Sequence, residues 1–439
     1  MARVGLVAAT ALGIGGMMGA APYTMLGLAA PATGSYLPVA FAVAALAAAF
    51  PAYSYARLGS TFPSRGGAAR FIVEEYGPGL ASGGLNVFQF LAYLIAASLY
   101  AAGFAAYAQA LVGDALPSWT AGAFGVGVVL VFLVVNLFGS RLVGRAETVI
   151  VAVEVVILVG FVVLGLSHAD PSRLTDGGGR GFLGIVTGAA VLYVSYQGFG
   201  VVANASDRMA RPGREVPRAM FLALGIVTVL YVTISALAVS LLPMPTIVAD
   251  NGHVLADAGQ VVAGRIGFVV IAVAALLATA SAVNATLFAA SNIGYFEARH
   301  GELSSALART VGRSGSVALV LSAAVVALLV LLFPLSAVGQ MTSLAFLVLY
   351  AGVSAGHLRI RARTGAHAWP LIAAVVINVV LFVALLADAI GSGSVGTWAT
   401  LLAALVGSFA IEAVYIARSD GRGGRRRQVA ASTADDAGP

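Results

Sequence analysis

The chain has 439 residues, of which 60% are hydrophobic and only 10% are charged, and its mean hydropathy is +0.97. A water-soluble protein carries about 25% charged residues to cover its surface, so this composition excludes a soluble globular domain. The net charge is +6, and all 24 basic residues are arginines that lie almost entirely in loops between apolar runs, which argues against a nucleic-acid interface. The chain contains no cysteine, which excludes disulfides and thiolate chemistry.

Apolar stretches long enough to cross a bilayer occur about twelve times along the chain. They predict membrane-spanning helices near residues 4–29, 37–56, 84–112, 119–138, 147–167, 183–204, 219–242, 265–290, 315–333, 335–356, 369–389 and 397–417. With a cytoplasmic amino terminus, every arginine except Arg173, Arg180 and Arg265 falls on the inner side. We therefore expect an all-α polytopic membrane protein with both termini cytoplasmic. The polar stretch 419–439 is expected to be a disordered cytoplasmic tail.

Two of these stretches contain glycine clusters in the middle of an apolar run, over residues 13–22 and 195–200. The two clusters occupy equivalent places if the chain consists of two five-helix units, and such a pair is the best sequence pointer to the substrate site of a secondary transporter. A helix broken there offers free N–H groups to a carboxylate and free carbonyls to an ammonium. The same glycines, for example Gly15 and Gly19, also suit close packing of membrane helices.

Three motifs at the predicted cytoplasmic ends of helices carry a family resemblance. Residues 55–67 resemble the signature Y-x-E-L-x-x-x-x-P-x-x-G-G, with Arg57 in place of the acid. Residues 207–217 look like E-x-x-x-x-P-x-R-x-x-P, with Asp207 in place of the glutamate, and residues 290–303 are similar to S-R-x-x-x-x-M-A-R-D-G-x-L-P. Through these motifs the chain resembles the amino acid, polyamine and organocation (APC) superfamily of permeases.

This resemblance implies a single transmembrane domain over residues 1–418 with a LeuT-type five-plus-five inverted repeat. Repeat one would cover about 4–167, repeat two about 183–356, and two additional helices about 369–417. The resemblance also implies a substrate site between the first and sixth helices. Carried over by position, its substrate-binding residues are Ile14, Gly15, Gly16, Gly19, Tyr193, Tyr196, Gly198 and Phe199. The first-helix glycines would receive the α-carboxylate, carbonyls near Ile14 and Tyr196 the α-amine, and the three aromatic residues would form a side-chain pocket or gate.

The candidate ion-coupling residue is Glu154, because an ionisable group in the body of a membrane helix is costly and marks a functional site. Some proton-coupled members of the family have a lysine at about this place, so we expect Glu154 to bind and release a proton. A structural glutamate remains an alternative, and so does sodium coupling through Thr279 and Ser281 of the eighth stretch. The amide residues within the spans are expected to be interhelical hydrogen-bond partners rather than ligands, namely Asn86, Gln89, Asn136, Asn204, Asn284 and Asn378. The histidines show no metal-ligand spacing, so no metal site is expected.

The sequence thus predicts a permease of the plasma membrane that moves a neutral or small amino acid by alternating access, in symport with protons. The preference for a neutral substrate rests on the scarcity of acidic residues within the spans. The alternatives are a polyamine or cationic amino acid exchanger on the same fold, and a non-transporting receptor or channel. The spans contain no constellation of nucleophile, base and metal, so neither an enzyme nor a cofactor is expected. The expected partners are the substrate, the coupling ion (H⁺ or Na⁺) and membrane lipid.

Overall fold

The computed structural model of the protein describes residues 4–19, 21–63, 67–113, 117, 119–138, 143–249, 252–300, 303–312 and 315–420. The first part of the chain forms α1 (Leu6–Met18), α2 (Ala21–Thr33), η1 (Gly34–Tyr36), α3 (Leu37–Thr61), α4 (Gly67–Tyr76), α5 (Leu80–Val112), α6 (Trp119–Phe138) and α7 (Val143–Gly165). The middle part forms η2 (Pro171–Thr175), α8 (Gly181–Leu192), η3 (Tyr193–Arg208), α9 (Pro212–Leu241), α10 (Met244–Ala249) and α11 (Val254–His300). The last part forms η4 (Ser305–Ala308), β1 (Thr310–Val311), β2 (Gly315–Ser316), α12 (Val317–Leu332), α13 (Leu335–Thr364), α14 (Ala368–Gly391) and α15 (Val395–Asp420).

The helices account for all the predicted apolar stretches. Within the described residues, nine helical stretches are long and apolar enough to cross a membrane, and three shorter apolar helices accompany them. The stretch predicted at 4–29 is divided between α1 and α2, and the other predicted stretches each coincide with one spanning unit. The short antiparallel pair of β1 and β2, with Thr310 opposite Ser316, does not change the class. The prediction of an all-α polytopic membrane protein of roughly twelve helices is therefore confirmed.

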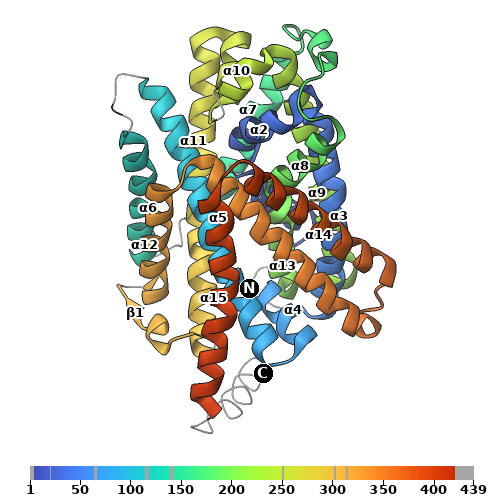
Figure 1. Ribbon diagram of the computed structural model, residues 1–439, viewed down its shortest axis with the longest axis vertical. Helices are drawn as coiled ribbons and strands as arrows, with labels where there is room; N and C mark the ends of the chain where they lie inside the picture. The colour runs from blue at the N-terminus through green and yellow to red at the C-terminus, as the bar shows by residue number, and fades with distance from the viewer. Residues whose placement is uncertain are drawn as a thin grey trace.

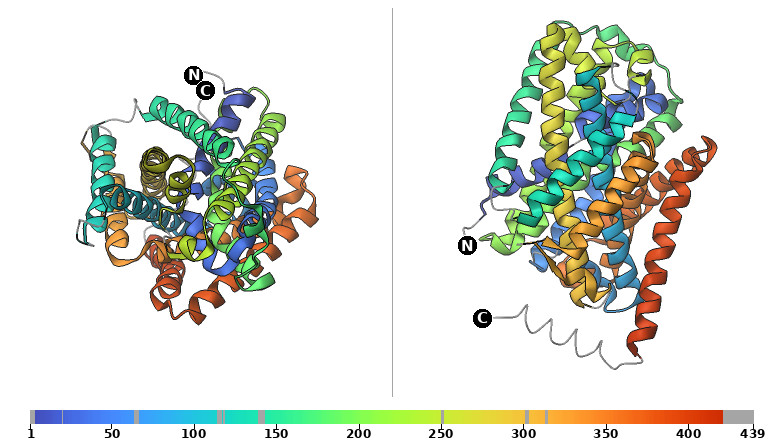
Figure 2. Two further views of the ribbon diagram at one scale, coloured as in Figure 1. Left: turned by 90° about the horizontal axis from the view of Figure 1, so that it is seen from above. Right: turned by 90° about the vertical axis from the view of Figure 1, so that its left-hand side faces the viewer.

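The helices form a bundle in which α5 is central and α15 is peripheral. The most apolar 18-residue window of α5 is 78% buried, whereas that of α6 is 22% buried and that of α15 17% buried. Figure 2 shows α15 standing along the edge of the bundle. Exposed apolar side chains on the outer helices, such as Val131 of α6 and Leu331 of α12, are the surface that a lipid environment favours. The helix α15 reaches Asp420, and residues 421–439 of the expected tail lie outside the described residues.

The two ends of the bundle are built differently, and we name each by its short helix. The helix α4 lies in the lower half of Figure 1 and α10 near the top. Near the α10 end, the loop before α8 is held to the end of α2, because the Arg180 N–H donates to the Ala32 carbonyl at 3.0 Å and the Ser35 N–H to the Gly177 carbonyl at 3.2 Å. Gly34 has φ +58° and a side chain there would meet the backbone of this loop, so the junction requires glycine.

A kink divides α11 close to where the eighth apolar stretch was predicted to begin. Ala263 and Gly264 have non-helical dihedral angles, with φ +60° at Gly264, and the long straight part of the helix follows them. The guanidinium of Arg265 then lies 5.0 Å from the centre of the Phe268 ring. A glycine at positive φ accounts for the kink, because a side chain is disfavoured in that conformation.

Candidate functional site

The first span is interrupted inside the bundle. The helix α1 ends at Met18, Gly19 has φ −29° and ψ −105°, and α2 begins at Ala21. Pro22 lies in the first turn of α2, where its missing N–H has no helical partner to lose. The first turn of α2 therefore presents unpaired N–H groups and the positive end of a helix dipole to the break, as the glycine cluster indicated.

The sixth span changes its winding rather than stopping. The helix α8 ends at Leu192, and the chain continues as the 16-residue 3₁₀ helix η3. Runs of 3₁₀ helix longer than three or four residues are uncommon, because the hydrogen-bond geometry is poorer than in an α-helix, and a long stretch often marks a functional hinge. The cluster at 195–200, expected to break the helix, lies within this 3₁₀ segment.

Side chains of α13 satisfy the backbone groups that this change of winding frees. The hydroxyl of Ser343 donates to the Val191 carbonyl at 2.7 Å and accepts from the Val194 N–H at 3.4 Å. The hydroxyl of Tyr350 donates to the Gln197 carbonyl at 2.7 Å. Buried backbone groups need such partners, so α13 is part of what makes the irregular segment tolerable in the bundle.

The two irregular segments touch each other backbone to backbone. A Cβ added to Gly198 would overlap the carbonyl group of Gly16, and one added to Gly16 would lie 2.8 Å from the Gly198 carbonyl oxygen. A Cβ added to Gly19 would lie 2.8 Å from the Cβ of Ala282 on α11. Gly16 and Gly198 thus allow the two segments to approach closely, and Gly19 stands where α1 ends.

Two tyrosines that the sequence reasoning did not single out bind carbonyls around the first break. Tyr231 of α9 donates to the Met17 carbonyl at 2.7 Å, and Tyr107 of α5 donates to the Tyr23 carbonyl at 2.8 Å. Both side chains are buried. A tyrosine in the middle of an apolar span could have signalled this role, because a buried phenol needs a hydrogen-bond partner.

Glu154 lies beside the same break. It is 3% exposed on α7, and its carboxyl group faces the hydroxyl of Tyr23 and interacts electrostatically with Tyr231. One turn earlier on α7, Val151 lies 3.1 Å from where a Cβ of Gly15 would be. The structure therefore brings the candidate coupling residue and the candidate substrate-binding glycines to one place.

The residues of the sodium alternative are on the neighbouring helix α11. The Thr279 hydroxyl donates to the Ala275 carbonyl of its own helix at 2.6 Å, and Ser281 is partly buried. Elsewhere on α11, Asn284 accepts a 2.8 Å hydrogen bond from Asn136 of α6, so these two amides bond between helices as expected. Asn378 instead donates to the Ala374 carbonyl of its own helix at 2.7 Å. Within the described part of the chain, no group of three or more metal-ligating side chains is placed to hold a metal ion.

The three predicted pocket aromatics fall into two surroundings. Phe199 stacks on Tyr350 with centroids 5.1 Å apart and meets Tyr55 edge-on at 5.5 Å, and Tyr193 lies 6.0 Å from Tyr350. We call these four buried residues the aromatic cluster. Tyr196 instead points toward α3, where its hydroxyl donates to the Phe41 carbonyl at 3.1 Å. Ile14, Gly15 and Gly16 are half-buried on α1, which packs against η3.

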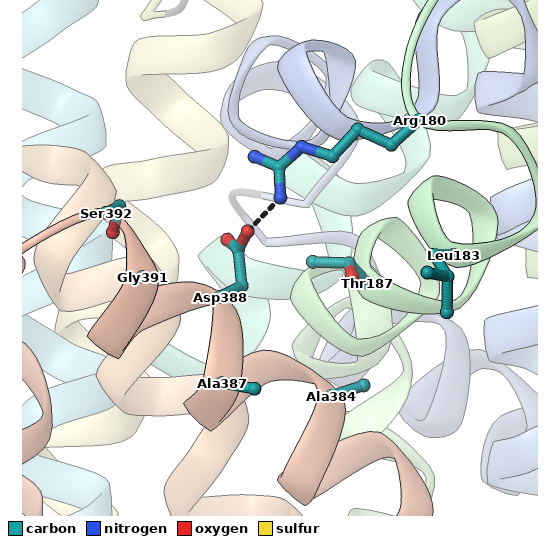
Figure 3. Close-up of a pocket in the computed structure, with 8 residues that line it drawn as sticks. All are labelled: Arg180, Leu183, Thr187, Ala384, Ala387, Asp388, Gly391 and Ser392. Carbon is teal, nitrogen blue, oxygen red and sulfur yellow. Dashed lines mark hydrogen bonds and ion pairs between the residues drawn. The ribbon is translucent and has the colours of Figure 1, made fainter.

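A separate cavity of about 540 Å³ lies between the start of α8 and the end of α14. Figure 3 shows Arg180 and Asp388 joined across it by an ion pair, with Thr187 beside Asp388. None of its lining residues belongs to the predicted substrate site. Arg180 and Asp388 are 208 residues apart in the chain, so no local sequence pattern predicts their pairing.

Comparison with known proteins gives a consistent picture. The family model described as "Amino acid permease" matches residues 4–417. An uncharacterised protein of Methanocaldococcus jannaschii is 33% identical over 81% of this chain and 82% of its own length. The inner membrane transport protein YbaT of Escherichia coli is 29% identical over 82% of this chain and 84% of its own. The branched-chain amino acid permease BcaP of Lactococcus lactis is 26% identical over 81% of each chain.

Proposed function

This chain belongs to the amino acid permease family, and from that membership we propose that it carries a neutral or small amino acid across the plasma membrane by alternating access, in symport with protons. The contact between Gly16 and Gly198 is the observation that carries the proposal. It brings two irregular backbone segments, one from each half of the chain, to one place inside the bundle. Irregular backbone at membrane depth is tolerated where it is buried or lines a path, and substrates of such transporters bind between the broken helices.

The break offers complementary groups for an amino acid. The first turn of α2 supplies N–H groups and a positive dipole end for the α-carboxylate, with Gly19 leaving room for the approach. The end of α1 and the start of η3 supply carbonyls for the α-amine, near Ile14 and Tyr196. Tyr193 and Phe199 would then border the side-chain pocket on the side of the aromatic cluster.

The distribution of buried charge favours a neutral substrate. Four carboxyl groups are buried in the described residues, those of Glu75, Glu154, Glu297 and Glu412. Glu75 lies on α4, Glu297 near the end of α11 and Glu412 on α15, so Glu154 alone of the four faces residues of the break. We assign Glu154 to the coupling proton, which leaves the substrate side chain without a fixed opposite charge.

The position of Glu154 also supports proton coupling over sodium. A carboxyl group beside the hydroxyl of Tyr23 can gain or lose a proton as the α1–α2 break rearranges, which links protonation to substrate binding. The Thr279 hydroxyl already donates within its own helix, which is the ordinary use of threonine in a membrane helix.

The topology we propose follows from the arginines. With both termini cytoplasmic, the α4 end of the bundle faces the cytoplasm and the α10 end faces outward, as the positive-inside rule requires. The equivalent places of the two irregular spans support an inverted repeat of residues 4–167 and 183–356, with α14 and α15 as additions.

The test is uptake of a pool of radiolabelled amino acids into proteoliposomes, with an inward proton gradient and without sodium. Saturable uptake that an uncoupler abolishes is the expected result. Uptake driven only by internal putrescine or arginine would show an exchanger of cationic substrates instead. Binding without counterflow would show a receptor, and unsaturable ion flux a channel; each of these three results would overturn the proposal.

A further inference from the structure

The short helix α4 lies toward one end of the bundle. It packs against α13, α5, η3 and α3, and it is visible in the lower half of Figure 1. Its Phe71 and Ile72 are fully buried, and the hydroxyl of Tyr76 donates to the Gly352 carbonyl of α13 at 2.7 Å. Apolar contacts and this hydrogen bond therefore help to seat the helix on α13.

The carboxyl group of Glu75 is buried in this seat without a partner. The residue is 4% exposed, and neither carboxyl oxygen has a hydrogen-bond partner among the described residues. It presses on α13 so closely that a Cβ added to Gly356 would lie 2.5 Å from Oε2. The adjacent Glu74 is different, because it pairs with Arg363 at 3.1 Å and with Arg70 at 3.7 Å.

An isolated buried carboxylate is costly, whereas the neutral acid is much less so. Burial accordingly raises the pKa of Glu75 well above its ordinary value. Two arginines of α13 have other partners: Arg363 is engaged with Glu74, and Arg359 lies over the Tyr76 ring at 5.5 Å. The elements packed against Glu75 carry several other titratable or charged groups. They are Arg70, Glu74 and Tyr76 of α4, Tyr53, Tyr55 and Arg57 of α3, Tyr93, Tyr100 and Tyr107 of α5, Tyr193, Tyr196, Asp207 and Arg208 of η3, and Tyr350, His357, Arg359, Arg361 and Arg363 of α13.

Direct contacts connect this seat to the irregular sixth span. Phe71 of α4 meets Tyr55 edge-on at 5.7 Å, and Tyr55 meets Phe199 of η3 at 5.5 Å. Tyr55 also interacts electrostatically with Glu75 itself. A displacement of α4 would therefore remove the contact of Phe71 with Tyr55 and so loosen the packing of the aromatic cluster against η3.

We propose that Glu75 is a second proton-binding residue, whose neutral form seats α4 against α13 and whose ionisation releases α4 and opens this end of the bundle. The proposal concerns a site away from Glu154 and does not depend on which substrate is carried. It gives the protein a gate that responds to the pH on the α4 side.

The natural chain contains no cysteine, so a single introduced thiol reports on α4 without background. Ala69 of α4 is 4% exposed, and Thr61 at the end of α3 is exposed. The protein is reconstituted in nanodiscs and labelled with N-ethylmaleimide between about pH 5 and pH 8. The labelling rate of Ala69→Cys is divided by that of Thr61→Cys at each pH. This ratio cancels the pH dependence that thiol ionisation gives to both rates. We expect this ratio to rise with pH, by at most about tenfold per unit for a single proton.

The Glu75→Gln and Glu75→Met variants should keep the ratio low and independent of pH, whereas Glu74→Gln should leave its pH dependence intact. Two neutral variants are used so that misfolding of one, detected by size-exclusion chromatography, leaves the test in force. A ratio that is flat in the natural background, or that rises equally in the Glu75 variants, would overturn the proposal.

A second pair of variants tests the seat without touching the carboxyl group. The Gly356→Ala methyl group would push against Glu75, whereas the Gly352→Ala methyl group would make ordinary contact with Leu85 at 3.4 Å. We expect Gly356→Ala to raise the Ala69→Cys labelling ratio at every pH and Gly352→Ala to leave it unchanged. Equal ratios for the two variants would show that α4 is not seated by Glu75 and Gly356, and would contradict the proposal.

Discussion

The hydroxyl of Tyr231 takes the place of a missing backbone donor at the carbonyl of Met17, 2.7 Å away. In a continuous helix that carbonyl would accept from the N–H four residues later, but α1 ends at Met18. The tyrosine on α9 thus supports the broken conformation of the first span. On the other side of the break, Tyr107 of α5 donates to the Tyr23 carbonyl in the first turn of α2.

The first prediction follows from this bond. Tyr231→Phe leaves a buried carbonyl without its donor, which costs about 1–3 kcal/mol. We expect a lower unfolding temperature in detergent and slower uptake in proteoliposomes. The control is Tyr36→Phe, because Tyr36 is 41% exposed and lies outside the break. Identical melting and uptake of Tyr231→Phe and the natural protein would show that the bond does not support the break.

A second prediction concerns the contact of the two irregular segments. Gly198→Ala places a methyl group on the carbonyl of Gly16, and backbone cannot move aside as a flexible side chain can. We expect loss of transport and a clear drop in thermal stability. Gly225→Ala on α9 is the matched control, since open space surrounds that position and alanine favours the helix by about 1 kcal/mol. If both variants transport equally, the close approach is not required.

The spans could be predicted from the sequence because a bilayer demands apolar runs of fixed length, which composition alone reveals. The helix α4 was missed because it is short and lies outside those runs. A signal was present nonetheless: Phe71, Ile72 and Glu75 share one helical face, while Arg70 and Glu74 are more exposed. An acidic residue on the apolar face is the feature that would have drawn attention to it.

The site could be predicted only in part. Glycines inside apolar runs indicated the irregular segments, because a regular lipid-facing helix has no need of glycine clusters. The partners of the freed backbone groups, such as Ser343, Tyr350 and Tyr231, come from helices far away in the chain. Which hydroxyl meets which carbonyl depends on how helices pack, and a local pattern carries no information on that.

A third prediction concerns the ion pair in Figure 3. The Arg180 side chain is 56% exposed and that of Asp388 12% exposed, so solvent screens much of their attraction. A double-mutant cycle of Arg180→Ala and Asp388→Ala, measured by thermal unfolding at low and high salt, should give a coupling of about 0.2–1 kcal/mol that weakens with salt. A much larger coupling that is insensitive to salt would contradict this prediction and show that the pair holds α8 to α14.

The fourth prediction is a pH dependence of stability arising from Glu75. Its pKa is raised in the folded protein, so the folded state binds the proton more tightly than the unfolded state does. Stability should therefore be fully present below the unfolded pKa of about 4.3 and be lost as pH rises toward the folded value, by up to about 1.4 kcal/mol per unit. Glu75→Gln lacks this loss and should melt higher than the natural protein at pH 8, with the difference shrinking toward pH 4. A constant difference across this range would contradict a raised pKa.

The fifth prediction separates proton coupling from substrate binding at Glu154. A one-unit pH gradient stores about 1.4 kcal/mol per proton, which is about tenfold in accumulation for one-to-one symport. Glu154→Gln keeps the shape of the side chain but cannot ionise, so we expect it to retain counterflow and lose the response to the gradient. Glu412→Gln is the control, because Glu412 is also fully buried but packs against Gly83 of α5, away from the break.

The outcome also decides between the two coupling ions. If Glu154→Gln accumulates substrate in response to the proton gradient as the natural protein does, the carboxyl group is structural. If uptake instead requires sodium and Thr279→Ala abolishes that requirement, the ion binds on the α11 side of the break. Since Thr279 and Glu154 lie on different helices around the same segment, the two variants assign the coupling ion to one side of the break or the other.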